Sequence, residues 1–213
     1  GAFAIASAYR YFPKKTVHVV VVDPGVGTAR RPILVQAAGQ YFVAPDNGVL
    51  SMVYARERHG VRAITSEKHF LQPVSRTFHG RDVFAPTAAL LAKGTPPARF
   101  GKLIQDYARQ RFAEPVRTGK RFWQGAVLTV DHFGNLITNF HIDEFAALKT
   151  RPFALSCGQA ALAELSETFA AGEPGEPVLV VGSSGYLEIA LNQGSAAKAL
   201  GCEAGAPVDL TVW

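Results

Sequence analysis

Two loops in the first half of the sequence carry side chains that could do chemistry. In VVVVDPGVGTARRPILV, residues 19–35, a run of valines ends at Asp23, and Arg30 follows. In TFHGRDVFAP, His79 comes just before Arg81 and Asp82. Carboxylate and imidazole groups can accept a proton or hold a water molecule, and an arginine stabilises developing negative charge. Each residue also has a purely structural interpretation. Asp23 could belong to an ordinary strand-to-loop turn, Arg30 could be a surface cation, and His79 could be a loop histidine. Asp82 could be a helix cap with Arg81 as its counterion.

The turn after Asp23 limits the kinds of ligand this region can hold. Its two glycines allow a sharp turn at the end of a strand, where open α/β sheets place ligand sites. The GVG stretch is not a dinucleotide fingerprint, because Arg30, Arg31 and Pro32 follow it in place of a third glycine and a helix. The chain has no GxSxG elbow, no HExxH motif and no cysteines at metal spacing. Acyl-serine and zinc-hydrolase chemistry therefore lack their usual sequence evidence.

The elements that must position these loops alternate between strands and helices in the first half. An apolar run such as TVHVVVVD is typical of a strand buried on both faces of a parallel sheet. Alternating strands and helices predict an α/β domain with a mainly parallel central sheet. The predicted elements are a helix over 2–11, the strands TVHVVVVD, PILVQA and QYFVA, a helix over 49–58, the strand VRAI, and a helix with Asp82 as its N-cap that ends at Gly94.

From residue 115 the pattern changes to short strands and tight turns. AVLTVDHFGNLITNFH and EPVLVVGSSGYLEIALN each predict two strands joined by a turn, and APVDLTVW predicts a further strand. We expect an N-terminal α/β domain over 1–114 and a smaller, mostly antiparallel β-rich domain over 115–213, with the boundary in FAEPVRTGK.

Composition restricts the class of protein. The 213 residues are 48% hydrophobic and 18% charged, as expected of a globular protein with a core. No apolar run approaches the ~20 residues of a membrane span, and the first residues lack the features of a signal peptide. The net charge of +5 is scattered and accompanies no nucleic-acid-binding motif. We expect a cytoplasmic protein with no membrane or nucleic-acid partner, and reduced thiols at Cys157 and Cys202.

Five motifs in order resemble those of the S-adenosyl-L-methionine (SAM) hydroxide adenosyltransferases, relatives of the fluorinase and chlorinase enzymes. They are VVDPGVGTARRPI, YFVAPDNGVLS, TFHGRDVFAP, VDHFGNLITN and SSGYLEIALNQGSAA. The resemblance implies hydrolysis of SAM to adenosine and L-methionine by attack at ribose C5′, with SAM as the substrate and with no cofactor and no metal. It also implies a homotrimer with active sites between the N-terminal domain of one subunit and the C-terminal domain of the next.

The resemblance further implies roles for individual residues. Members of the family's hydrolytic branch place an Asp, an Arg and a His near the reacting carbon, and Asp23, Arg30 and His79 are the matching residues here. For Arg30 the alternative is a surface cation, with its neighbour Arg31 the better stacked of the two arginines. The departing sulfonium becomes a neutral thioether, so it needs no proton, whereas water is a poor nucleophile that must be held and activated.

In the second half, the resemblance implies binding of the methionine and adenine parts of SAM. Asp131 would bind the ammonium group and Ser183 the carboxylate end, Asn135 the adenine edge, and Phe169 would stack on the ring. Phe133, in the same turn as Asp131, is a further substrate-binding candidate. Each of these residues also has an interpretation without a ligand, for example Asp131 as the acid of an ordinary turn and Phe169 as a core residue.

The sequence departs from the family pattern in two places. Ser184 stands where the halogenating relatives carry an arginine. The family's first strand, with an Asp-Phe-Gly motif that holds the ribose hydroxyls, is not in this sequence, so we expect an additional N-terminal segment in the full-length protein. Two alternatives remain open. One is a SAM-dependent halogenase, which retention of Asp23 and His79 disfavours, and the other is a non-catalytic SAM or adenosine binding module.

Overall fold

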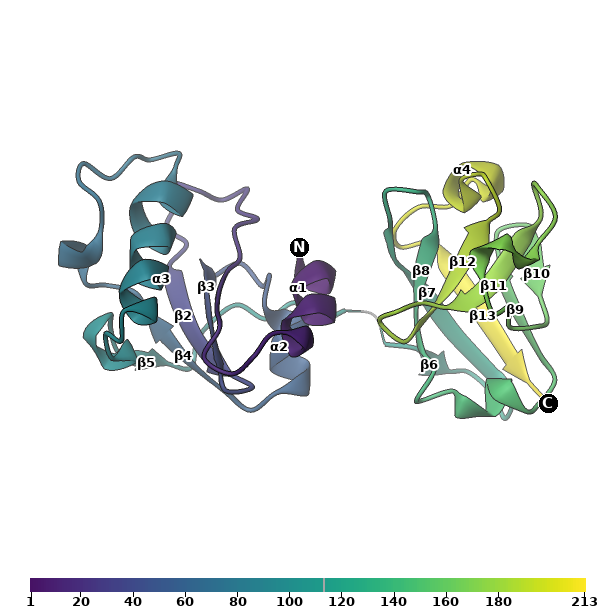
Figure 1. The fold of residues 1–213 in the computed structure, drawn as a ribbon. Coiled ribbons are helices and arrows are strands. Elements are labelled where there is room, and N and C mark those ends of the chain that lie inside the picture. The colour runs from purple at the N-terminus through teal and green to yellow at the C-terminus, as the bar shows by residue number, and fades with distance from the viewer. Residues whose placement is uncertain (113) are drawn as a thin grey trace. The chain divides into compact units, whose positions relative to one another are not determined.

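A computed structural model describes residues 1–112 and 114–213, which form two compact units, Gly1–Arg111 and Phe112–Trp213 (Figure 1). Each unit has its own sheet. Within the segment FAEPVRTGK, where the sequence places the domain boundary, residue 113 lies outside the described residues. The protein is thus a mixed α/β chain with one sheet in each half.

The first unit contains the predicted helices and strands, with shifted ends. The helix expected over 2–11 is present as an α-helix and a 3-10 turn, and the helix expected over 49–58 is shorter. The elements are α1 (Ala2–Ala8), η1 (Tyr9–Tyr11), β1 (Val17–Val19), β2 (Pro32–Ala37), β3 (Gln40–Pro45), α2 (Ser51–Arg56), β4 (His59–Ala63), η2 (Glu67–His69), the π-helical turn η3 (Gly80–Phe84), α3 (Ala85–Ala92), η4 (Pro97–Arg99) and β5 (Leu103–Ile104).

The prediction of a mainly parallel sheet is wrong. The strand order is β1-β3-β2-β4-β5, and only β1 and β3 run parallel. β2 and β3 are joined by Ala38 and Gly39, whose φ angles are 53° and 73°. Two consecutive residues with positive φ form the turn that closes an antiparallel hairpin, whereas a parallel pair needs a long crossover. The short connection therefore decides the strand direction.

The valine run before Asp23 forms a shorter strand than predicted. β1 ends at Val19, and Val21 and Val22 are 44% and 52% exposed. β1 lies at the edge of the sheet, where β3 is its one neighbour among the described strands. An edge strand leaves part of its backbone and apolar surface unpaired, and this explains the exposure.

The sheet of the first unit is covered by helices on both faces (Figure 1). On β2, Ile33 and Val35 pack in the cluster that contains Val53 of α2, whereas Leu34 packs in the cluster that contains Leu91 of α3. Successive side chains of a strand point to opposite faces. A continuous apolar strand is therefore needed here, because both faces are buried.

The second unit is an eight-stranded sheet with the order β10-β9-β13-β7-β8-β12-β11, and β6 pairs with β7. All its paired strands are antiparallel. Its elements are β6 (Val116–Arg117), β7 (Phe122–Val130), β8 (Leu136–His141), η5 (Ala146–Lys149), β9 (Phe153–Cys157), β10 (Ala160–Leu162), η6 (Phe169–Ala171), β11 (Pro177–Val181), β12 (Tyr186–Leu191), α4 (Ala196–Leu200) and β13 (Pro207–Val212).

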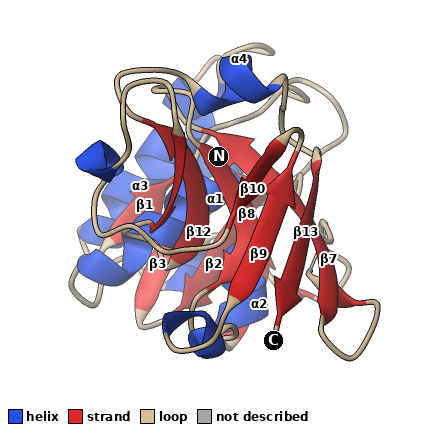
Figure 2. Ribbon diagram, turned by 90° about the vertical axis from the view of Figure 1, so that its right-hand side faces the viewer, coloured by secondary structure: helices blue, strands red, loops and turns tan. Residues whose placement is uncertain are grey.

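This second sheet curls until it is nearly a barrel. Figure 2 shows β9, β13 and β7 as neighbouring strands of one wall. At the two ends of the strand order, an isolated bridge joins Ser166, which follows β10, to Val180 of β11. The curled sheet encloses one apolar cluster that includes Leu136, Leu155 and Leu187, each fully buried.

The two cysteines are closer than their sequence separation suggests. Cys157 and Cys202 are free thiols whose Sγ atoms lie 3.6 Å apart. Burial, followed by the contact with Cys202, raises the pKa of Cys157 to about 12. Among the described residues, no helix is long and apolar enough to cross a membrane.

Candidate active site

Asp23 and Arg30 lie at the two ends of the glycine-containing loop between β1 and β2. The loop turns tightly, since Val26 N–H donates to the Asp23 carbonyl at 3.2 Å and the Thr28 hydroxyl donates to the Gly25 carbonyl at 2.7 Å. The turn brings the two side chains together: Arg30 Nε donates to Asp23 Oδ1 at 3.0 Å, and Arg30 Nη2 donates to Asp23 Oδ2. The side chains are 7% and 5% exposed, so this is a buried, two-point ion pair.

His79 reaches the same guanidinium from a distant loop. Arg30 Nη2 lies 2.8 Å from His79 Nδ1. An arginine has no acceptor, so Nδ1 must accept this hydrogen bond, and a neutral His79 carries its proton on Nε2. The structure thus brings Asp23, Arg30 and His79 together around a single guanidinium group.

His79 is held in the neutral form at ordinary pH. Burial and then the positive charge of Arg30 lower the pKa of His79, while the carboxylates of Asp23 and Asp82 act in the opposite direction. A histidine beside an arginine would otherwise bring two like charges together. The site therefore combines one buried ion pair with a neutral imidazole whose Nε2–H has no hydrogen-bond partner among the described residues.

Arg30 retains one hydrogen-bond donor that the described residues do not use. Its Nη1 is buried and has no hydrogen-bond partner among them. Arg30 and His79 also line a pocket of about 610 Å³ within the first unit, together with Thr65 and Phe70. A buried polar group without a partner is costly in a folded protein, which makes it a candidate ligand contact.

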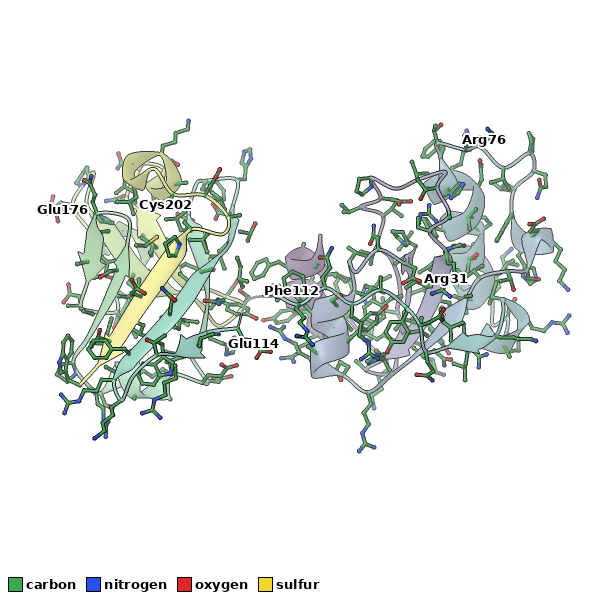
Figure 3. The ribbon with its side chains drawn as sticks, turned by 180° about the vertical axis from the view of Figure 1, so that it is seen from behind. Arg31, Arg76, Phe112, Glu114, Glu176 and Cys202 are labelled. Carbon is green, nitrogen blue, oxygen red and sulfur yellow. The ribbon has the colours of Figure 1, made fainter. Side chains whose placement is uncertain are left out.

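Arg31, the neighbour of Arg30, has a different environment. Figure 3 labels Arg31 in the first unit. Arg31 Nη2 donates to Asp46 Oδ2 at 2.8 Å, and Nη1 lies 3.1 Å from Asp106 Oδ1, with the Arg31 side chain 35% exposed. The expectation that Arg31 is the better stacked of the two is wrong, because it is the Arg30 guanidinium that lies 5.3 Å from the centre of the Phe84 ring. Adjacent residues entering β2 point to opposite sides, so only Arg30 reaches Asp23.

The segment that carries His79 is held by Asp82. Asp82 Oδ2 accepts from Ser75 N–H at 2.8 Å, and Oδ1 accepts from Arg81 Nε at 2.6 Å. These bonds, first that from Arg81, lower the pKa of Asp82 to about 2. The prediction that Asp82 is a helix N-cap is wrong, because the helical turn already begins at Gly80.

A π-helical turn, rather than a regular start of α3, follows His79. Pro86 near the start of α3 has no N–H and cannot bond to the Asp82 carbonyl four residues before it. That carbonyl instead accepts from Leu71 N–H at 2.8 Å. This hydrogen bond from Leu71 joins the loop before His79 to the start of the helix. π-Helical turns are frequent at functional sites.

In the second unit, Asp131 organises the turn between β7 and β8. Asp131 Oδ1 accepts from Phe133 N–H at 2.9 Å and Asn135 N–H at 2.8 Å, and Oδ2 accepts from Asn135 Nδ2 at 2.9 Å. Asn135 is buried, whereas Phe133 is 76% exposed. Asp131, Phe133 and Asn135 therefore form one cluster, with an aromatic ring free to meet a ligand.

The other two predicted substrate-binding residues of the second unit lie on separate turns. Ser183 is exposed in the turn between β11 and β12, closed by a 2.9 Å bond from Gly185 N–H to the Gly182 carbonyl. That turn adjoins the His141 end of β8, whereas the Asp131 turn adjoins its Leu136 end. Ser183 and Asp131 therefore lie on different turns, and Glu188 relates to both, because its side chain reaches the Ser183 turn and the charge of Asp131 acts on it. Phe169 is half-exposed in η6.

Glu188 is a buried carboxyl group that the sequence motifs did not single out. It lies on β12, and an added Cβ at Gly182 would overlap its Oε1, so its side chain reaches the Ser183 turn. Burial, followed by the charge of Asp131, raises the pKa of Glu188. A single acid in the otherwise apolar run YLEIAL was the available signal for it. Among the described residues no cluster of His, Cys, Asp and Glu could hold a metal ion.

The two halves of the chain match the two domains of one protein family. Residues 1–101 match the SAM hydroxide adenosyltransferase N-terminal domain, and residues 125–209 match the C-terminal domain of the same family. The chain belongs to the SAM hydroxide adenosyltransferase family. The resemblance seen in the sequence motifs is thereby confirmed.

Several relatives match nearly the whole chain. A protein of Salinispora tropica named (R)-S-adenosyl-L-methionine hydrolase is 40% identical over 99% of this chain and 80% of its own length. A hydrolase of the same name from Thermus thermophilus is 37% identical over 98% of this chain and 81% of its own length. A fluorinase of Actinopolyspora mzabensis is 30% identical over 99% of this chain and 82% of its own length.

A solved structure has the same fold. The crystal structure of an uncharacterised conserved protein from Thermotoga maritima superposes with a TM-score of 0.88 at 36% identity, covering 99% of this chain and 82% of that chain.

Proposed function

We propose that the protein hydrolyses SAM to adenosine and L-methionine by attack of water or hydroxide at ribose C5′. The observation that carries this proposal is the buried guanidinium of Arg30, bonded to Asp23 on one side and to His79 on the other. The 36–40% identity to proteins named (R)-S-adenosyl-L-methionine hydrolase supports the same reaction.

The reaction requires activation of the attacking water, whereas the leaving group needs no catalysis. The C5′–S bond breaks with its electron pair going to sulfur, so a sulfonium becomes a neutral thioether and no acid is needed. The new C5′–O bond forms from a water molecule that must lose a proton. Arg30 Nη1 and His79 Nε2–H are two donors left free by the described contacts. A water oxygen that accepts from both is stabilised as it becomes hydroxide, in the manner of an oxyanion hole.

This arrangement assigns different roles to the three residues. His79 Nδ1 is engaged by Arg30, so His79 acts as a donor to the water rather than as its base in this state. Both oxygens of Asp23 are engaged by Arg30, so Asp23 fixes the guanidinium and balances its charge. The proton that the attacking water loses passes to bulk solvent, because both Asp23 oxygens and His79 Nδ1 already accept hydrogen bonds from Arg30.

The second unit supplies the proposed contacts to the rest of SAM. Asp131 binds the methionine ammonium and Ser183 the carboxylate end, while Asn135, Phe133 and Phe169 bind the adenine. Phe133 and Phe169 support this proposal because they are exposed rings that a ligand would cover. We propose that these residues serve a neighbouring subunit of a homotrimer. Light scattering tests the trimer, and a monomer that turns over SAM would contradict it.

Product analysis tests the reaction itself. The protein is incubated with SAM in ¹⁸O-labelled water containing chloride or fluoride, and the nucleoside product is identified by mass. We expect adenosine with one ¹⁸O atom at C5′. A 5′-halogenated nucleoside would identify a halogenase instead, and calorimetric binding of SAM without any product would identify a binding module.

A further inference from the structure

The second unit contains a basic and aromatic pocket that the proposed hydrolysis does not use. Its volume is about 560 Å³. Three segments meet around it: the β6–β7 hairpin, η5 with the turn that follows it, and the end of β13. The side chains that define its chemistry are those of Arg117, Lys120, Arg121, Arg151, Trp123 and Trp213. None of them is among the residues proposed to contact SAM.

The concentration of positive charge in this pocket is not a by-product of a basic domain. Residues 112–213 contain six Lys and Arg side chains against eleven Asp and Glu, a net charge of −5. Four of those six cations line the pocket, and Glu144 is the one acid that lines it among the described residues. A local cluster of cations in an acidic domain raises the local concentration of anions, and like charges come together at a cost unless a ligand offsets it.

The cations and rings differ in how firmly they are held. Arg117 Nε donates to the Gly119 carbonyl at 3.1 Å and Nη2 to the Lys120 carbonyl at 2.6 Å, and its guanidinium lies 5.3 Å from the centre of a Trp123 ring. Trp123 in turn packs edge-on against Phe145, with ring centres 5.6 Å apart. Arg117 and Trp123 therefore form a preorganised wall.

The remaining cations are available to a ligand. Every ion pair between described residues lies elsewhere, so Lys120, Arg121 and Arg151 have no carboxylate partner among them. Backbone hydrogen bonds hold the main chain at or beside Arg121 and Arg151. Val212 N–H donates to the Arg121 carbonyl at 3.0 Å, and Trp213 N–H donates to the Pro152 carbonyl at 3.0 Å. These two bonds place the Trp213 backbone, with a half-exposed indole, between two unpaired cations.

We propose that this pocket binds a nucleoside phosphate. Guanidinium groups match phosphate oxygens in a two-point geometry, and indole rings stack on a planar base. The volume lies within the range of small-molecule sites, about 300–1,000 Å³. The cations gather in one pocket rather than along a stripe, which favours a free nucleotide over an extended nucleic acid. This proposal is independent of the proposed SAM hydrolysis.

The chain offers a direct probe of this pocket. Trp123 and Trp213 are the two tryptophans of the sequence, and both line the pocket, so tryptophan fluorescence reports on it alone. We expect ATP to quench the fluorescence saturably, AMP to bind more weakly, and adenosine or inorganic phosphate to bind at least tenfold more weakly than ATP. The quenching by ATP persists when the protein is saturated with SAM, because the SAM contacts are different residues.

Two variants separate this site from general electrostatic attraction. The double substitution Arg121→Ala with Arg151→Ala removes two exposed side chains and leaves their backbone bonds, so the fold is retained, and ATP affinity should fall at least tenfold. Lys198→Ala removes an exposed cation from α4, at the opposite end of the unit from β6 (Figure 1), and should leave the affinity unchanged. Calorimetry repeats the comparison without relying on fluorescence.

Several results would overturn the proposal. They are an absence of saturable ATP binding up to millimolar concentration, equal affinity in the double variant, or loss of the ATP signal when SAM is added. Tighter binding of a single-stranded oligonucleotide than of ATP would replace the free nucleotide with a nucleic acid as the partner.

Discussion

The backbone of Gly27 packs directly against the carbonyl oxygen of Arg76. Gly27 has φ of 77°, a conformation that L side chains rarely adopt, and an added Cβ would overlap the Arg76 oxygen. Gly27 belongs to the loop between Asp23 and Arg30, and Arg76 belongs to the loop that leads to His79. This single approach therefore sets how closely the two halves of the proposed catalytic cluster meet.

Replacing Gly27 with alanine should separate the two loops. We expect Gly27→Ala to destabilise the protein by about 1–3 kcal/mol through the strained backbone, and to lower kcat more than it raises the KM for SAM. Gly94→Ala is a matched control, because Gly94 also has positive φ but an added Cβ there meets nothing within 4 Å. Equal kinetic effects of the two substitutions would show that the approach to Arg76 does not matter.

The neighbouring arginines provide a second matched pair. Arg30→Lys keeps a cation beside Asp23 but loses the fork that also reaches His79, so we expect kcat to fall by about 10²-fold with SAM binding largely retained. Arg31→Lys should stay within a few-fold of the parent, since Arg31 contacts Asp46 and Asp106 instead. Melting curves of both variants check that each is folded. A larger loss in Arg31→Lys would contradict the assignment of Arg30.

Activity should decline on the acid side at a pH set by His79. Burial and Arg30 lower the pKa of His79, so its neutral form persists below the ordinary histidine value of 6.5. Protonation places a hydrogen on Nδ1, which then cannot accept from Arg30. We expect the acid limb of kcat/KM against pH to have its midpoint below 6.5, and to be absent from the residual activity of His79→Gln. A midpoint above 6.5 would contradict the partly buried, neutral imidazole.

Glu188 should make the protein less stable as pH rises. Its pKa is raised above the value of 4.5 for an ordinary glutamate, first by burial and then by Asp131. Between these two values the folded state binds more protons than the unfolded state, so the free energy of unfolding falls with increasing pH. We expect Glu188→Gln to raise Tm at neutral pH and to leave it unchanged below about pH 4.

An exposed acid provides the control for this measurement. Glu176, in the turn before β11, lies at the surface of the second unit (Figure 3), and Glu176→Gln should not change Tm at either pH. A parent protein whose Tm rises from pH 5 to pH 7 by the same amount as that of Glu188→Gln would show that Glu188 is not the cause.

The hairpins of the second unit were predictable because their signals are local. A glycine-containing turn between two alternating runs specifies an antiparallel pair wherever it occurs, as in the turn that Asp131 organises. In the first unit, the two-residue turn Ala38–Gly39 is an equally local signal for the antiparallel pair of β2 and β3. The edge position of β1 was not predictable in this way, because the valine run before Asp23 suits a buried central strand and an edge strand equally.

For the proposed site, the residues could be predicted from the sequence, but their contacts could not. Asp23, Arg30 and His79 were found through motifs, yet their mutual contacts depend on loop packing that no spacing encodes. Arg30 and Arg31 are chemically alike in sequence, and only the direction of each side chain separates them. Asp82 has the features of a helix cap, but the helical turn begins at Gly80, and Pro86 leaves the Asp82 carbonyl to accept from Leu71 N–H.

The position of β13 bears on how the second unit is completed during synthesis. β13 is the last strand of the unit along the chain, yet it lies between β9 and β7. Until it emerges from the ribosome, both of these strands have an open edge, and the contacts that close them join residues far apart in sequence. The last described strand of the first unit, β5, ends at Ile104, so the strands of that unit emerge before those of the second unit. Newly made chains are therefore most exposed to mispairing in the interval just before β13 is released.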